Sequence, residues 1–135
     1  MSLQYSVTVR NAQLDAFETA IGTSPILHFY TGSAPANCAA SATGTVLASA
    51  TLPSDWMNNA SGGSKTMLGT WEDTSADNTG TAGYWRINDS TDTNCHAQGT
   101  VTATGGGGDM TVDNTSFAAG QDFKVTTFTL TAGNS

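Results

Sequence analysis

The sequence predicts a mainly β protein: a single-domain antiparallel β-sandwich or jelly-roll-like barrel across residues 1–135, with one short N-terminal α-helix at about residues 12–21. Short runs of alternating apolar and polar residues recur along the chain and are separated by turn-forming clusters, which is typical of such folds. Hydrophobic residues make up 38% of the chain, below the usual share of about 45–50%. The core is therefore expected to be thin, as between two sheets.

The N-terminal part contains the one helix that the sequence predicts. Before it, Tyr5–Val9 alternates between apolar and polar side chains and predicts a short strand. Three apolar residues then follow at helical spacing: Leu14, Phe17 and Ile21. Asn11 stands where an N-cap belongs and Gly22 where a left-handed residue ends a helix, so we expect a helix over Ala12–Ile21. Its apolar stripe is expected to cover a sheet.

Further strands are predicted from the β-branched and aromatic runs that follow the helix. Pro25 precedes the first of these runs, and Pro53 ends the second. Threonine is frequent at the outward positions, where its branched Cβ favours a strand. The predicted strands are Ile26–Tyr30, Thr45–Leu52, Thr66–Trp71, Gly80–Ile87, Cys95–Thr104, Met110–Val112 and Phe123–Leu130.

Clusters of Asn, Asp, Ser and Gly between these runs predict turns, and the most unusual of them is the tetrad Gly105–Gly108. A phosphate-binding loop is a poor interpretation of the tetrad, because no Gly-Lys-Ser/Thr sequence follows and no helix is predicted to begin there. We expect a flexible hairpin or a loop that adapts to a partner.

Charge is scarce in this chain. Only 11% of the residues are charged, against about 25% in an average domain, and four are basic. With a net charge of −7 the chain is poorly suited to neutralise phosphates, so we expect no direct binding to nucleic acid or to a membrane surface. No apolar run reaches the length of a membrane helix, and the first residues predict no signal peptide. A surface of Thr, Ser, Asn and Gly suits neutral contacts with copies of the chain, another protein or a sugar.

The two cysteines, Cys38 and Cys95, lie far apart in the sequence. A disulfide between them would close a loop long enough to contribute on the order of 4 kcal/mol to stability. Because no signal peptide is visible, the sequence favours two reduced, buried thiols. No CxxC pair is present, so no zinc site is predicted.

Residues suited to acid–base chemistry are few. His28 lies within an apolar run and is expected at the edge of the core with one nitrogen hydrogen-bonded. His96 follows Cys95, but neighbours in a strand point to opposite faces, which disfavours a nucleophilic pair. Neither a GxSxG nor an HExxH motif occurs. The sequence therefore predicts no catalytic residue and no cofactor site.

Acidic residues gather in two predicted loops, at residues 72–78 and 89–94. Oxygen ligands from such loops hold hard cations, and a pair of carboxylates can serve a glycosidase. The same residue types are ordinary turn formers, and EF-hand spacing is absent. The turn interpretation is preferred, and no metal site is predicted.

Six large aromatic residues allow either a sugar-binding platform or a core: Trp56, Trp71, Trp85, Tyr5, Tyr30 and Tyr84. Such side chains usually fill the interior of a small sandwich, which favours the core. Trp56 follows a predicted turn and is the best candidate for an exposed ring.

Several segments together resemble a known group of proteins. They are Asn11–Ala16, Ile21–Pro25, Phe29–Pro35, Gly44–Ala48, Leu52–Trp56, Gly80–Ile87 and Cys95–Gly99. From about Val9 to Leu130, the chain resembles small virion proteins encoded by tailed bacteriophages and prophages. These motifs are structural, so the resemblance transfers no active site.

The resemblance implies a capsid cement or decoration protein that binds the outside of the major capsid lattice and stabilises it. It also implies a homo-oligomer, expected to be a trimer, that is made in the host cytoplasm and located at the capsid surface. The expected partners are the major capsid protein and copies of the chain. The residues expected at these contacts are Gln4, Tyr5, Val7, Trp56, Gly105, Gly106, Gly107 and Gly108.

Other hypotheses stay open at this stage. A tail or adaptor subunit of the virion would share the fold and the surface, and the sequence has no feature that separates it from a capsid protein. A carbohydrate-binding module, as in a head fibre, would use the aromatic residues. A small hydrolase has the least support, because no pair suited to proton transfer is evident.

Overall fold

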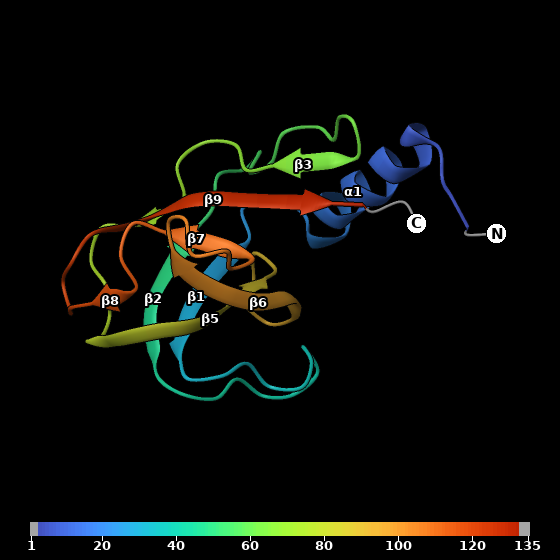
Figure 1. Ribbon diagram of the computed structural model, residues 1–135. Coiled ribbons are helices and arrows are strands. Elements are labelled where there is room, and N and C mark those ends of the chain that lie inside the picture. Colours follow the sequence, from blue (N-terminus) through green and yellow to red (C-terminus); the bar gives the residue numbers. More distant parts are fainter. Residues whose placement is uncertain (1–2, 133–135) are drawn as a thin grey trace.

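The computed structural model describes residues 3–132 and shows a curled, mixed β-sheet with one helix at its end (Figure 1). The sheet wraps around a hydrophobic cluster in the manner of a half-barrel. The prediction of a mainly β fold with one short helix is confirmed.

Helix α1 (Val7–Ile21) begins earlier than the sequence predicts. Its N-cap is Ser6, whose Oγ accepts a hydrogen bond from the Val9 N–H at 3.2 Å. The predicted strand over Tyr5–Val9 is wrong, because the cap satisfies its backbone locally and no strand of the described chain pairs with it.

The rest of the helix follows the predicted pattern. Its apolar stripe faces the interior: Leu14, Phe17 and Ile21. Gly22 follows the last helical residue with a φ of 92°, and its N–H donates to the Glu18 carbonyl at 2.9 Å. Asn11, the predicted N-cap, lies within the helix, where its Oδ1 accepts a hydrogen bond from the Gly63 N–H at 2.9 Å.

The described chain contains nine strands: β1 (Ile26–Thr31), β2 (Val46–Thr51), β3 (Ser64–Thr66), β4 (Glu72–Asp73), β5 (Gly80–Asn88), β6 (Cys95–Ala103), β7 (Met110–Val112), β8 (Ser116–Phe117) and β9 (Phe123–Thr131). Six of the seven strands predicted after the helix are confirmed to within two residues. The strand predicted over Thr66–Trp71 is wrong, because Gly69 turns the chain there with a φ of 78°. β3, β4 and β8 were not predicted, since two or three residues carry no periodic signal.

The strand order is β2-β1-β5-β6-β7-β9-β3, with β4 paired to β9 and β8 to β5. β6 and β7 run parallel, and the other pairs are antiparallel. The sheet curls so that β9 passes above β1, β2 and β5 (Figure 1). Phe29 of β1 and Phe123 of β9 therefore meet in the interior, with their ring centroids 5.0 Å apart.

The glycine tetrad lies in the connection between β6 and β7. Parallel strands usually need a crossover of a dozen or more residues, yet here residues 104–109 suffice. Gly105 and Gly107 have φ values of 87° and 82°, and a Cβ on Gly106 would lie 2.8 Å from the Thr102 Cβ. The predicted hairpin is wrong, because the strands are parallel and the glycines form a tight return against β6.

The three tryptophans lie in the core. Trp56, Trp71 and Trp85 are 0%, 1% and 3% exposed. Phe128 joins two of them, with ring-centroid distances of 5.5 Å to Trp71 and 5.3 Å to Trp85. Such aromatic contacts add to the stabilisation from burial alone.

Lys65 on β3 fastens α1 to the sheet. Its side chain is buried, and Nζ lies 2.8 Å from the Asp15 Oδ1 and 2.9 Å from the Glu18 Oε1. The hydrogen bond from Lys65 holds the pKa of Asp15 below its ordinary value. Burial opposes the charge on Lys65, but the hydrogen bonds to Asp15 and Glu18 outweigh it and raise the pKa of Lys65.

We expect acid to weaken this contact between helix and sheet. A carboxylate whose pKa is lowered by folding stabilises the protein above its ordinary pKa of about 4, and that stabilisation is lost as the pH falls further. The melting temperature should therefore fall by several degrees between about pH 5 and about pH 2, and by less in Asp15→Asn. Asp122→Asn, at an exposed position before β9, is the control. Thermal unfolding followed by circular dichroism tests this; an equal fall in both variants would contradict it.

Candidate functional site

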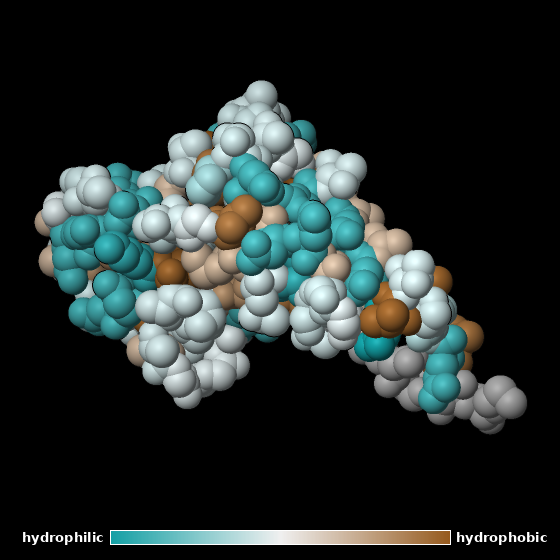
Figure 2. All heavy atoms as spheres, turned by 90° about the horizontal axis from the view of Figure 1, so that it is seen from above, coloured by the Kyte–Doolittle hydropathy of each residue, from teal (hydrophilic) through white to brown (hydrophobic). Residues whose placement is uncertain are grey.

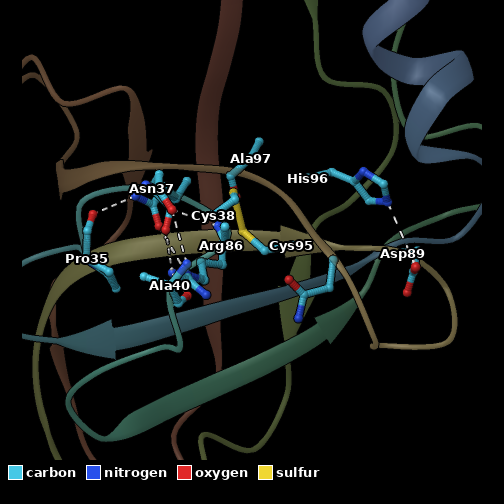
Figure 3. The surroundings of a disulfide bond; sticks show 12 residues. Pro35, Asn37, Cys38, Ala40, Arg86, Asp89, Cys95, His96 and Ala97 are labelled. Atoms are coloured by element: carbon cyan, nitrogen blue, oxygen red, sulfur yellow. Dashed lines mark hydrogen bonds and ion pairs between the residues drawn. A yellow bond between two sulfur atoms is a disulfide. The ribbon is translucent and has the colours of Figure 1, made fainter.

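The face of the sheet that points away from the core is polar and is covered by residues 33–43. Arg86 of β5 lies beneath this loop and is 5% exposed. Its Nη2 donates to the carbonyls of Asn37 and Ala40, at 3.3 and 2.8 Å (Figure 3). Its Nε donates to the Gln98 Oε1 at 3.1 Å. One guanidinium thus joins the loop to β5 and β6.

Cys38 and Cys95 form a disulfide that ties the same loop to the beginning of β6 (Figure 3). The preference for reduced thiols was wrong, because the loop folds back over the sheet and brings the two Cα atoms to 5.2 Å from each other. Cys95 therefore carries no thiol that His96 could activate. His96 instead lies with its Nε2 3.9 Å from the Asp89 Oδ2.

A cluster of Ser49, His28 and Asp92 lies on this outward face. His28 and Ser49 are opposite each other on β1 and β2, and the His28 Nδ1 lies 2.7 Å from the Ser49 Oγ. The His28 Nε2 lies 2.7 Å from the Asp92 Oδ1. His28 is at the edge of the core as predicted, but both of its nitrogens are engaged. Serine, histidine and carboxylate in this order form the pattern of an activated nucleophile.

The surroundings of Ser49 oppose nucleophilic catalysis. If Ser49 attacked a substrate carbonyl, the oxyanion formed on the carbonyl oxygen would need N–H donors beside it. The Ser49 N–H instead donates to the Asp73 Oδ2 at 3.1 Å, and its Oγ donates to the Asp77 Oδ2 at 3.4 Å. Two carboxylates would repel the developing negative charge. We interpret the cluster as a clamp that holds residues 89–94 on the sheet.

Asp89 serves as a turn former, which is the interpretation that the sequence favoured, whereas Glu72 and Asp73 of the other acidic cluster lie in β4. Asp89 accepts hydrogen bonds from the Thr93 N–H, the Asn94 side chain and the Thr91 hydroxyl, each at 2.9 Å. These bonds hold the pKa of Asp89 far below its ordinary value. Within residues 3–132, no group of three or more His, Cys, Asp or Glu side chains is placed to hold a metal ion. No helix of that range is long and apolar enough to cross a membrane.

The tryptophans do not form a platform on the surface of the described chain. The prediction that Trp56 is the best candidate for an exposed ring is wrong, because Trp56 is fully buried. It lies beneath the end of α1, where its Nε1 donates a hydrogen bond to the Gly22 carbonyl at 2.8 Å. The rings of Tyr30 and Tyr84 stack with their centroids 4.9 Å apart, and both side chains are buried. Burial raises the pKa of Tyr30. Tyr5 is 40% exposed.

Residues 3–9, which we call the N-terminal arm, carry the exposed large apolar side chains of the described chain: Leu3, Tyr5, Val7 and Val9. They are 69%, 40%, 45% and 43% exposed. Figure 2 shows hydrophobic residues on the tapered end of the molecule, where Figure 1 places the start of α1. Three predicted contact residues, Gln4, Tyr5 and Val7, lie together on this arm, whereas the glycine tetrad belongs to the β6–β7 connection and Trp56 to the core.

Leu3 and Val9 were not among the expected contact residues. The apolar residues that alternate along the arm are the signal in the sequence that could have identified them. The clamp and the loop-fastening role of Arg86 gave no such signal, because both depend on pairing between strands. Comparisons with protein-family models, with curated proteins and with solved structures find no match. The function is therefore argued from the geometry of this chain.

We expect the disulfide to contribute strongly to stability. Its cysteines are 57 residues apart in the sequence, and a loop of that size corresponds to on the order of 4 kcal/mol in the chain-entropy model. Urea denaturation of the wild type should shift to lower urea concentration on reduction. The double variant Cys38→Ser/Cys95→Ser should unfold like the reduced wild type with or without reductant. An unchanged midpoint for the reduced wild type would contradict this expectation.

We expect Ser49 to contribute no turnover of an activated ester. The wild type and Ser49→Ala should release p-nitrophenol from p-nitrophenyl acetate at the same rate, with no initial burst. Ser49→Ala should also be less stable by about 1 kcal/mol, because it removes a hydrogen bond from the clamp. A burst that disappears in Ser49→Ala would show instead that the cluster is a nucleophile.

Proposed function

We propose that the chain is a non-enzymatic structural protein that works by attaching to other protein subunits through the N-terminal arm. The observation that supports this most is the exposure of Leu3, Tyr5, Val7 and Val9, since the other large apolar side chains of the described residues are buried or half-buried. Clustered exposed apolar residues are typical of interaction sites.

The shape of the arm supports the same function. Residues 7–9 form the first turn of α1 and are exposed on every side, so this turn projects beyond the packed part of the helix (Figures 1 and 2). Two of its three side chains, Val7 and Val9, are apolar, and exposed apolar side chains that lie together are typical of surfaces that a partner covers. The arm carries no charge between Leu3 and Val9, so its burial requires no ion to leave water.

The subunits that we propose as partners are the major capsid protein of a tailed bacteriophage and further copies of this chain. The resemblance to small virion proteins motivates this choice, with a capsid cement or decoration protein, expected as a homotrimer on the capsid surface, as its specific form. Many copies on a repeating shell would gain avidity from contacts that are individually modest. Lys65, which fastens α1 to β3, would hold the base of each arm against the sheet.

Particles with and without the protein provide the test. Capsids that carry the wild type should withstand a higher temperature and lower salt than capsids that lack it. Tyr5→Ser/Val7→Ser should bind at least roughly tenfold more weakly, because it removes apolar contacts, whereas Thr8→Ser should bind like the wild type. Equal survival of capsids without the protein, together with no binding, would overturn the capsid assignment. Attachment to tails and not to shells would assign it to another part of the virion.

A further inference from the structure

A cleft of about 300 Å³ interrupts the sheet between β6 and β9. β7 separates these two strands but is short: it pairs with Val101–Ala103 of β6 and with Val125–Phe128 of β9. Beyond the start of β7, β6 and β9 both continue, and no strand of the described chain fills the space between them. The residues that line the cleft are Phe17, Trp85, Ala97, Gln98, Asp109, Phe128, Thr129 and Leu130.

The cleft is suited to apolar side chains. Five of its eight lining residues are apolar, and Asp109, its charged member, is engaged at one end. The Asp109 Oδ2 accepts hydrogen bonds from the Thr100 N–H at 3.0 Å and from the Thr100 Oγ1 at 3.2 Å. The Thr100 carbonyl accepts from the Trp85 Nε1 at 3.0 Å. The backbone N–H and carbonyl of Thr100 are thus both engaged by side chains at this end of the cleft, and the apolar lining offers a place for inserted side chains.

The N-terminal arm has the chemistry that this cleft requires. It is uncharged, and its four apolar residues are exposed. The cleft lies at the small end of the range of about 300–1,000 Å³ found for ligand sites, which suits one or two side chains of the size of Leu3 or Tyr5. Residues 7–9 are Val-Thr-Val, and such β-branched residues hold a helix weakly, so the arm can adjust its course on binding.

The arm of the same molecule is poorly placed to enter its own cleft. Phe17, which lines the cleft, lies about 15 Å along α1 from Val7. Residues 3–6 span at most about 14 Å when fully extended, and they leave the helix in the direction away from the sheet (Figure 1). A second molecule can present its arm to the cleft from outside without this restriction.

We propose that the N-terminal arm of one copy inserts Leu3 and Tyr5 into the β6–β9 cleft of a second copy. The arm and the cleft are different surfaces, so the contact is heterologous and closes into a ring when each copy gives one arm and receives one. The expected trimer is one such ring. The contact rests on the proposed attachment through the arm and names the part of a second copy that receives it, and it needs no capsid to form.

Complementary variants test this contact in the full-length chain. The arm variant Leu3→Ser/Tyr5→Ser has an intact cleft. The cleft variants Ala97→Phe and Thr129→Tyr have an intact arm and fill the cleft from β6 and from β9. Two cleft variants are used because either one alone risks disturbing the fold, which circular dichroism and thermal unfolding will show. Gln4→Ser/Thr8→Ser, at the polar positions of the arm, is the control.

Mass measured by light scattering and by native mass spectrometry gives the result. The wild type and the control should self-associate, and the arm variant and a folded cleft variant should each self-associate at least roughly tenfold more weakly. An equimolar mixture of the two should form a one-to-one pair, because one intact arm meets one intact cleft. A monomeric wild type, an arm variant that assembles like the wild type, or a mixture of folded variants that stays monomeric would overturn the proposal. Self-association through the arm and the cleft without any effect on capsids would leave this contact standing and would overturn the capsid assignment alone.

Discussion

The aromatic core is the packing on which the rest of this structure depends. A chain with 38% hydrophobic residues has little apolar material, and the curled sheet gathers most of it around Trp56, Trp71, Trp85 and Phe128. Because burial of large rings supplies much of the stabilisation in a small domain, these side chains are committed to the interior. What remains exposed, apart from the arm, is a polar surface rich in Thr, Ser, Asn and Gly, with acidic residues among them. The location of the apolar residues outside the core therefore becomes the main information about function.

The outward face of the sheet shows how a protein with few charges uses them. Arg86 and Lys65, two of the four basic residues, are both buried and both join segments that are distant in the sequence. Arg86 holds the covering loop through carbonyl oxygens, and Lys65 holds α1 through two carboxylates. Buried cations of this kind are costly unless their hydrogen bonds are satisfied, so they specify one arrangement of loop, helix and sheet. These two cations therefore serve the fold.

Local pattern in the sequence was sufficient for six of the strands and for the end of the helix, because alternation and a C-terminal glycine act within a few residues. It failed at the start of α1, where Ser6 and Asn11 are both acceptable caps and only the contact of Asn11 with Gly63 decides between them. It failed for Trp56, because a turn in the sequence does not show that α1 ends above it. The disulfide depends on how residues 33–43 fold over the sheet, and the cluster around His28 depends on the register of β1 with β2. Neither is a local property of the sequence. The predicted contact residues on the arm do lie on the surface, although within and before a helix and not in a strand.

The central claim is that the chain acts through burial of its N-terminal arm by other subunits. Hydrogen–deuterium exchange of the intact protein, measured at increasing concentration and after addition of capsids, tests it most directly. We expect the amides of residues 4–9 to exchange more slowly in the assembled state than in dilute protein, while those of β1 and β5 change little. Equal exchange of the arm in the dilute and assembled states, with new protection elsewhere on the surface, would contradict the account.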